Sequence, residues 1–243
     1  MTGLRQAAFA AWTVLQTLVL GIVFLPTLLG PRAWARRAYG VWLGGTMWAL
    51  RAIAGVTWEL RGAQNLPAGG ALIASKHQSM FDTIAPWVFL PDPAIVLKKE
   101  LTYIPIYGWW AKKLKNIVVD RGAASKAMRD MLGQAKARAA EGRQILIFPE
   151  GTRTAPGERV EYKPGAAGLY SVMGVPCVPV ALNSGLTWPQ SGFAPRPGHI
   201  VVEVLEPIPP GMKRDAFMIL LEERIESASA RLLETERCDS SSD

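Results

Sequence analysis

Residues 7–29 contain no charged side chain, and this uncharged run restricts the possible folds of the chain more than any other feature. A helix rises about 1.5 Å per residue, so the run is long enough to cross a hydrocarbon layer roughly 30 Å thick. It is also longer than the roughly 7–15 apolar residues of a signal peptide, and no clear cleavage site ends it before Gly30. We therefore expect a retained hydrophobic helix that associates with a membrane.

The arginines of the N-terminal part indicate how its helices are oriented in the membrane. A second apolar run, residues 38–56, is interrupted by Arg51 and by four glycines, so it is a poorer candidate for a span. The charged residues of positions 1–57 are five arginines: Arg5, Arg32, Arg36, Arg37 and Arg51. Short arginine-rich loops stay in the cytoplasm, so two full spans would place the rest of the chain outside.

One span, or two helices lying in the membrane interface, would keep the rest of the chain in the cytoplasm. The free Cys238 near the C-terminus favours that compartment. We therefore expect a membrane protein whose active site lies on the cytoplasmic face. A hydrophobic hairpin folded onto the core of a soluble protein remains an alternative.

The composition of the remaining chain excludes several classes of protein. Subtracting the five arginines from the 27 Lys and Arg of the 243-residue chain leaves 22, against 20 Asp and Glu. The net charge of +7 therefore belongs mostly to the apolar N-terminal part, and no nucleic-acid-binding motif is visible. A hydrophobic fraction of 49% excludes disorder, and two cysteines exclude a disulfide-stapled secreted scaffold.

From residue 56 onward, short β-rich runs alternate with helical ones. The expected strands are residues 56–61, 71–74, 94–97, 117–119, 145–148, 178–182 and 200–205. The expected helices are roughly residues 80–90, 104–115, 124–141, 165–173 and 213–236. This alternation predicts an α/β fold, a mixed, mostly parallel sheet flanked by helices. We expect N-terminal membrane-associating helices over residues 1–55, the α/β domain over 56–238, and a disordered tail over 239–243.

Several catalytic devices are missing from the sequence. It contains no G-x-x-x-x-G-K-[ST] loop, no strand-to-helix G-x-G-x-x-G, no G-x-S-x-G elbow and no H-E-x-x-H. Two histidines and two widely separated cysteines argue against a structural zinc site. We expect neither a metal nor a cofactor, and a reaction that uses few ionisable groups.

A histidine and an aspartate lie where a predicted strand gives way to a helix. Ser79 is expected to cap that helix, with Asp82 in its first turn, so the chain reversal could bring the carboxylate back beside His77. A carboxylate that accepts the Nδ1 proton leaves Nε2 free to act as a base. On these residues alone, a simple helix cap with an incidental histidine is an equal alternative. Pro86 predicts that the helix is short or kinked.

Another candidate site follows the strand at residues 145–148. The strand ends at Pro149, and charged, flexible and hydroxylated residues follow as far as Arg153. The planar guanidinium of Arg153 suits a phosphate group. The alternative is a surface turn with a Glu–Arg pair, which contributes little to stability.

Four ordered sequence blocks together resemble the glycerolipid acyltransferase family. They are His77-x4-Asp82, the stretch 98–121, the run Phe148–Arg153 and the stretch 175–180. One H-x4-D is common by chance, whereas four blocks in this order within residues 56–205 are not. The sequence departs from the family at Lys76, where many members have Asn, and residues 1–55 match only in being hydrophobic.

The resemblance implies transfer of a fatty acyl group from acyl-CoA or acyl carrier protein to the sn-2 hydroxyl of lysophosphatidic acid at a membrane. His77 would be the general base, oriented by Asp82. The residues that would bind the acceptor are Lys98, Arg121, Glu150, Gly151, Thr152 and Arg153. Glu150 would position Arg153 or a glycerol hydroxyl. Backbone N–H groups after Ser79 are one option for the oxyanion hole.

Two other readings remain open at this point. An acyltransferase with a different acceptor, another lysophospholipid or a lyso-aminolipid, would share the same base. A non-enzymatic basic membrane-binding protein is suggested only by the positive charge.

Overall fold

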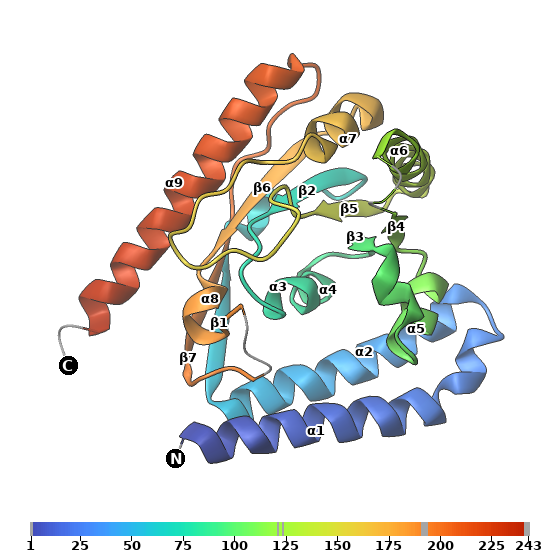
Figure 1. Cartoon of the computed structure of the whole chain (residues 1–243), viewed down its shortest axis with the longest axis vertical. Coiled ribbons are helices and arrows are strands. Elements are labelled where there is room, and N and C mark those ends of the chain that lie inside the picture. The colour runs from blue at the N-terminus through green and yellow to red at the C-terminus, as the bar shows by residue number, and fades with distance from the viewer. Residues whose placement is uncertain (1, 121, 123, 191–193, 241–243) are drawn as a thin grey trace.

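The fold is built on one seven-stranded sheet. The computed structural model describes the backbone of residues 2–120, 122, 124–190 and 194–240. The strands follow the order β1-β7-β6-β2-β5-β3-β4 (Figure 1). Their bounds are β1 (Val56–Arg61), β2 (Ala71–Ser75), β3 (Pro93–Lys98), β4 (Ile117–Val119), β5 (Gln144–Ile147), β6 (Cys177–Leu182) and β7 (Gly198–Val204). Each end lies within two residues of the sequence-based expectation.

The strand directions confirm a mixed, mostly parallel sheet. β6 and β7 are antiparallel, and every other pair of neighbours is parallel. β2 lies between β5 and β6, with Ala74 opposite Ile147 of β5 and Pro179 of β6. The carboxyl ends of β2 to β6 therefore share one edge of the sheet, which is where open α/β sheets place their ligands.

The central strands are covered on both faces. All five residues of β2 are buried, and alternate side chains enter different clusters. Ala71 and Ile73 join one cluster, whereas Leu72 and Ala74 join the other. A strand buried on both faces reads as a continuous apolar run, which explains why the sequence shows no alternation here.

Helices form a layer on each side of the sheet (Figure 1). The longer helices are α1 (Thr2–Val23), α2 (Arg32–Ala49), α5 (Tyr107–Lys113), α6 (Ala124–Ala140), α7 (Gly165–Met173) and α9 (Arg214–Ser240). The short ones are α3 (Phe81–Ile84), α4 (Pro86–Phe89), α8 (Ser184–Thr187), η1 (Leu25–Leu28), η2 (Leu50–Ala54), η3 (Ala63–Asn65) and η4 (Lys99–Tyr103). α6, α7 and α9 cover one face, while α2, α3 and α4 lie on the other.

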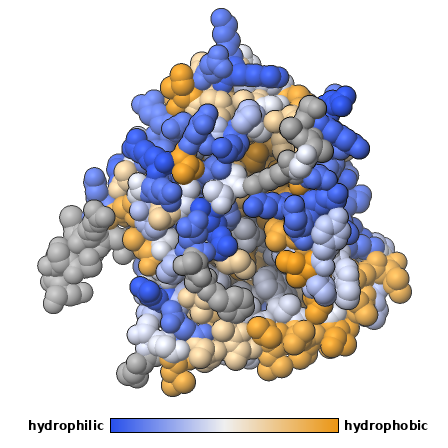
Figure 2. Space-filling view, in the orientation of Figure 1, coloured by the Kyte–Doolittle hydropathy of each residue, from blue (hydrophilic) through white to orange (hydrophobic). Residues whose placement is uncertain are grey.

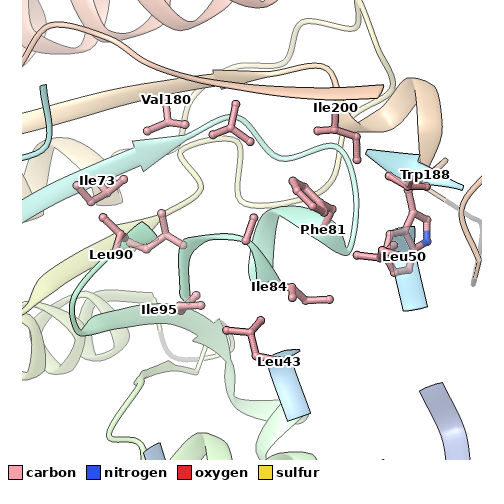
Figure 3. Packing of buried hydrophobic residues seen from close by; sticks show 14 of the residues in the cluster. Leu43, Leu50, Ile73, Phe81, Ile84, Leu90, Ile95, Val180, Trp188 and Ile200 are labelled. Carbon is pink, nitrogen blue, oxygen red and sulfur yellow. The ribbon is translucent and has the colours of Figure 1, made fainter. Parts of the chain in front are cut away.

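The N-terminal helices share the core of the domain. Strand residues Ile73, Val180 and Ile200 pack in one cluster with Phe81 and with Leu50 (Figure 3). Phe9 of α1 is fully buried in the same cluster and meets the Trp188 ring edge-on at 5.5 Å. The expected boundary between residues 55 and 56 therefore crosses a shared core, and the division into domains stays a prediction.

α1 and α2 form an antiparallel hairpin along one side of the molecule (Figure 1). Polar side chains tie the helices together: Gln16 Nε2 donates to the Trp42 carbonyl at 2.6 Å, and Trp42 Nε1 donates to Thr17 Oγ1 at 3.0 Å. Among the described residues, α1 is the helix long and apolar enough to cross a membrane. Its other side exposes large apolar residues, Ile22 at 70% and Leu15 at 60% among them.

Two expected helices differ from the structure. The one at residues 80–90 is divided into α3 and α4 at Pro86, as the proline predicted. The one at 104–115 begins only at Tyr107, because Ile106 adopts a positive φ of 66° and Tyr107 N–H bonds the Pro105 carbonyl at 2.7 Å. α9 continues to Ser240, past the expected start of the tail, and residues 241–243 lie outside the described part of the chain.

Candidate active site

Parallel topology brings two distant sequence blocks to one edge of the sheet. His77 follows the carboxyl end of β2, and Phe148 follows that of the neighbouring β5. The imidazole of His77 stacks on the Phe148 ring, with centroids 4.0 Å apart and planes 19° from parallel. The two blocks are therefore in direct contact although about seventy positions separate them.

The histidine is oriented by a buried carboxylate. His77 Nδ1 lies 3.1 Å from Asp82 Oδ2. Because a carboxylate oxygen accepts, Nδ1 carries the proton and Nε2 presents its lone pair. The imidazole remains 14% exposed, and no hydrogen-bond partner of Nε2 occurs within the described ranges. This arrangement suits a general base whose ring is held and whose reactive nitrogen is accessible.

Asp82 is fixed from several directions. Its Oδ2 accepts the N–H groups of Gln78 at 2.6 Å and of Ser79 at 2.7 Å. Its Oδ1 accepts the hydroxyl of Ser184, at the start of α8, at 2.6 Å. Ser79 Oγ in turn accepts the Phe81 N–H at 3.1 Å. The amides of Ser79 and Phe81 thus already have partners, so neither is a free donor for an oxyanion hole.

The main chain of His77 is also held on both sides. Its N–H donates to Glu150 Oε2 at 2.8 Å, and its carbonyl accepts the N–H of Thr154 at 2.8 Å. Thr154 Oγ1 lies 3.0 Å from Glu150 Oε1. The described contacts of the buried Glu150 carboxylate are with the His77 N–H, Lys76 and Thr154, and a role in positioning Arg153 or a glycerol hydroxyl stays a prediction.

A buried ion cluster lies behind this contact. Lys76 Nζ is 2.8 Å from Glu150 Oε1 and 2.8 Å from Glu226 Oε1 of α9. The Tyr162 hydroxyl also donates to Glu226 Oε1, at 2.8 Å. Burial raises the pKa of Glu150, while the nearby Lys76 ammonium and the His77 and Thr154 donors lower it. Burial, followed by the Glu226 charge, raises the pKa of Tyr162, which keeps its hydroxyl a donor.

Apart from the buried Glu150, the expected acceptor-binding residues that the structure describes are half-buried or exposed. Gly151 adopts a positive φ of 70° in the turn that its N–H closes onto the Phe148 carbonyl at 3.0 Å. Thr152 after it is exposed, and Arg153 is half-buried. Lys98 is exposed at the end of β3, with β5 between β3 and β2. Arg121 lies outside the described residues.

Comparison with known proteins identifies the family. The sequence profile of the family described as Acyltransferase matches residues 57–183. A 1-acyl-sn-glycerol-3-phosphate acyltransferase of Pseudomonas aeruginosa is 36% identical over 181 residues, which cover 74% of this chain and 70% of the relative. The chain belongs to the acyltransferase family. The acyltransferase resembles a plant protein as well, the 1-acyl-sn-glycerol-3-phosphate acyltransferase of Limnanthes alba, at 27% identity over 82% of this chain and 68% of the relative.

The fold of the acyltransferase also matches a solved structure. The crystal structure of the 1-acyl-sn-glycerophosphate (LPA) acyltransferase from Thermotoga maritima superposes with a TM-score of 0.73 at 22% identity. The match covers 96% of this chain and 98% of that one. It extends over the N-terminal helices too, where the sequence resemblance consisted only of hydrophobic character.

Some site residues of the acyltransferase had no recognisable local signal. Ser184 contacts Asp82 although 102 positions separate them, and Glu226 contacts Lys76 across 150 positions. Neither lies in a motif, and a serine or a helical glutamate is ordinary on a protein surface. Lys76 stands out in the sequence only as a departure from the family pattern next to His77.

Proposed function

We propose that this acyltransferase transfers a fatty acyl group from a thioester to the sn-2 hydroxyl of 1-acyl-sn-glycerol-3-phosphate, giving phosphatidic acid. The observation that carries the proposal is the His77–Asp82 pair, with Nδ1 at 3.1 Å from the carboxylate and Nε2 accessible. The names of the relatives support the same acceptor, since they are 1-acyl-sn-glycerol-3-phosphate acyltransferases.

The proposed reaction requires one base and no acyl-enzyme. Nε2 of His77 takes the proton of the hydroxyl while that oxygen attacks the thioester carbonyl carbon. The carbon–sulfur bond then breaks, and the imidazolium returns its proton to the leaving thiolate. Asp82 holds the ring and stabilises the transient positive charge. A well-placed base contributes on the order of 10²–10⁴-fold to such a step.

The phosphate of the acceptor needs a cation near this base. Arg153 follows the Phe148 turn, and its guanidinium suits a phosphomonoester. Lys98 at the end of β3 is a further candidate on the same edge, and Arg121 is a candidate from the sequence alone. We assign Gly151 and Thr152 to the turn that presents Arg153.

A membrane location is part of the proposal. The lower side of Figure 2 shows a hydrophobic band, and α1 and α2 run along that side in Figure 1. Exposed apolar residues of this band include Leu15, Leu18, Ile22 and Leu29. The opposite side of α1 is packed on α2 and on the core. Such one-sided exposure suits a hairpin lying in the interface, with the active site on the cytoplasmic face.

Acyl transfer by the purified full-length protein tests the proposal. A panel of lysolipid acceptors is crossed with acyl-CoA and acyl carrier protein donors, because the donor is open. We expect turnover with 1-acyl-sn-glycerol-3-phosphate and loss of turnover in His77→Ala. The partly exposed His199 offers the matched control, His199→Ala, which should stay active. Preference for an acceptor without a phosphomonoester, or turnover by His77→Ala, would refute the assignment.

A second variant tests whether Arg153 binds the acceptor or the donor. Arg153→Ala should raise the KM of the lysolipid far more than the KM of the thioester, because the guanidinium is assigned to the acceptor phosphate. Its control is Arg129→Ala on the exposed side of α6. A larger effect on the thioester KM would move Arg153 to the donor site.

A further inference from the structure

The residue before His77 carries a buried charge that the proposed reaction does not use. Lys76 is 1% exposed, and its Nζ contacts Glu150 and Glu226 at 2.8 Å each and the Glu158 carbonyl at 3.3 Å. Removing an ammonium from water costs several kcal/mol unless opposite charges surround it. A buried lysine at this position therefore has to be matched by its carboxylates, and this chain supplies two.

Besides the peptide bond between them, hydrogen bonds through Glu150 connect Lys76 to the His77 main chain. The ammonium holds Glu150 Oε1, and Glu150 Oε2 accepts the His77 N–H at 2.8 Å. Thr154, held by the same Oε1 at 3.0 Å, bonds the His77 carbonyl through its own N–H. The His77 peptide is thus fixed by a carboxylate whose own position depends on Lys76.

We infer that Lys76 is a positioning residue for acyl transfer: its buried ammonium holds the Glu150 carboxylate in place, so that Glu150 and Thr154 hold the His77 main chain. The inference rests on the proposed function, because it assumes that His77 is the base. Lys76 itself does not touch the reacting atoms.

The balance of charge in the cluster explains why the ammonium is needed. The Glu150 carboxylate contacts Lys76 and interacts with Tyr162, and Tyr162 in turn interacts with Glu226 and Glu222. Burial raises the pKa of Glu150, and Lys76 is the first-ranked influence that lowers it. Without Lys76, Glu150 and Glu226 would be two buried carboxylates with no described cation in contact, and one would bind a proton. A protonated Glu150 is a weaker acceptor for the His77 N–H.

The C-terminal helix completes the arrangement. Glu226 Oε1 and Oε2 accept from Lys76 Nζ at 2.8 and 3.0 Å, and Tyr162 fixes the same carboxylate. α9 thereby determines where the ammonium sits, although Glu226 is 150 positions from Lys76 in the chain. The helix contributes to the active site as well as to the core.

The test measures kcat, both KM values and the pH profile of full-length Lys76→Met. We expect kcat to fall about 10-fold to 100-fold, as when a catalytic group is displaced by about 1 Å, with smaller changes in KM. The acid limb of the kcat profile should move to higher pH, because Glu150 must lose its proton without a cation beside it. Raising the pH should restore part of the activity. The matched control, Lys136→Met on the exposed side of α6, should behave like wild type.

A second substitution tests the charge argument directly. Glu226→Gln leaves Lys76 and Glu150 as a balanced pair, so its acid limb should stay near that of wild type. In the double variant Lys76→Met/Glu226→Gln, Glu150 no longer faces a second carboxylate. The acid limb of the double variant's kcat profile should therefore lie at a pH between those of wild type and Lys76→Met, although the double variant has lost one more native contact. If Lys76 only stabilised the fold, the double variant would instead lose more activity than Lys76→Met.

A spectroscopic measurement makes the outcome independent of turnover. The His77 amide resonance of isotopically labelled protein should shift in Lys76→Met and titrate with pH, because its acceptor gains a proton. Wild-type kcat and an unmoved acid limb in a folded Lys76→Met would overturn the inference. So would activity lost equally at every pH with an unchanged His77 resonance. Absence of acyl transfer by wild type would instead contradict the proposed function, and the His77 resonance would still test the link to Lys76.

Discussion

Asp82 receives hydrogen bonds from its own turn and from Ser184, which follows β6. The serine belongs to α8, outside the turn that carries Asp82, so the carboxylate cannot rotate without breaking contacts on two elements. His77 therefore meets an acceptor at a fixed position. This explains how a single imidazole, 14% exposed, keeps one orientation beside solvent.

Replacing Asp82 with Asn tests this orientation at the residue scale. An amide nitrogen facing Nδ1 favours the tautomer with the proton on Nε2, which removes the base. We expect Asp82→Asn to lower kcat about 10²–10⁴-fold with a small change in acceptor KM. Steady-state kinetics at saturating thioester measure both. The exposed Asp130→Asn on α6 is the control, and a kcat within twofold of wild type would contradict the role of Asp82.

Glu150 predicts a dependence of stability on pH. Because the fold raises the pKa of this carboxyl, the folded protein holds the proton more tightly than the unfolded chain. Ionisation above that pKa therefore disfavours the fold. The melting temperature of Glu150→Gln, relative to wild type, should rise as pH increases from about 4.5. Thermal unfolding across pH tests this, with exposed Glu161→Gln as control, and a difference that falls with pH would contradict it.

At the scale of elements, α9 joins the core to the catalytic edge. Phe217, Leu221 and Ile225 are fully buried against α7 and the sheet, and Glu226 follows directly on the same helix. The Phe217 ring stacks on Tyr170 at 3.8 Å. Packing of these apolar residues holds the helix that carries Glu226 to Lys76.

The contribution of this packing is measurable. Phe217→Ala removes a fully buried ring, and we expect the free energy of unfolding to fall by about 3–5 kcal/mol. Denaturant unfolding of the solubilised protein measures the change. Ile219 on the same helix is 68% exposed, so Ile219→Ala should change stability by less than about 0.5 kcal/mol. Equal effects of the two variants would mean that α9 is not anchored through Phe217.

The helix bounds show which elements local sequence patterns predict and which they do not. The helices at 124–140 and 165–173 were predicted almost to the residue, because their apolar periodicity matches their burial. The helix at 107–113 was placed three residues too early. Its start depends on the positive φ of Ile106, a conformation that a β-branched residue adopts only when surrounding packing imposes it.

At the scale of the whole molecule, the apolar hairpin and the active edge determine how the protein meets a membrane. The side of α1 that exposes Leu15 and Leu18 has no covering element among the described residues. An apolar band of this kind is expected to enter the interface, and Arg36 and Arg37 of α2 add attraction to anionic lipids.

Substitutions on the exposed side of α1 test the membrane location. Leu15→Asp together with Leu18→Asp should reduce co-flotation with vesicles of anionic phospholipid, because two charges enter the apolar band. The fold should remain intact, since both side chains are about half-exposed. The control Ile219→Asp places a charge on exposed α9. Unchanged flotation of the α1 variant would assign membrane binding to another surface.

The sequence alone determined the α/β class, the strand positions and the His77 and Phe148–Arg153 blocks. These depend on local properties: apolar periodicity, residues that end helices and strands, and motifs of consecutive side chains. The tertiary structure decided which side chains meet. Parallel pairing of β2 with β5 sets the His77 ring on Phe148, and α9 carries Glu226 to Lys76. Such contacts join positions about seventy and 150 residues apart through strand order and helix packing, and no local pattern encodes them.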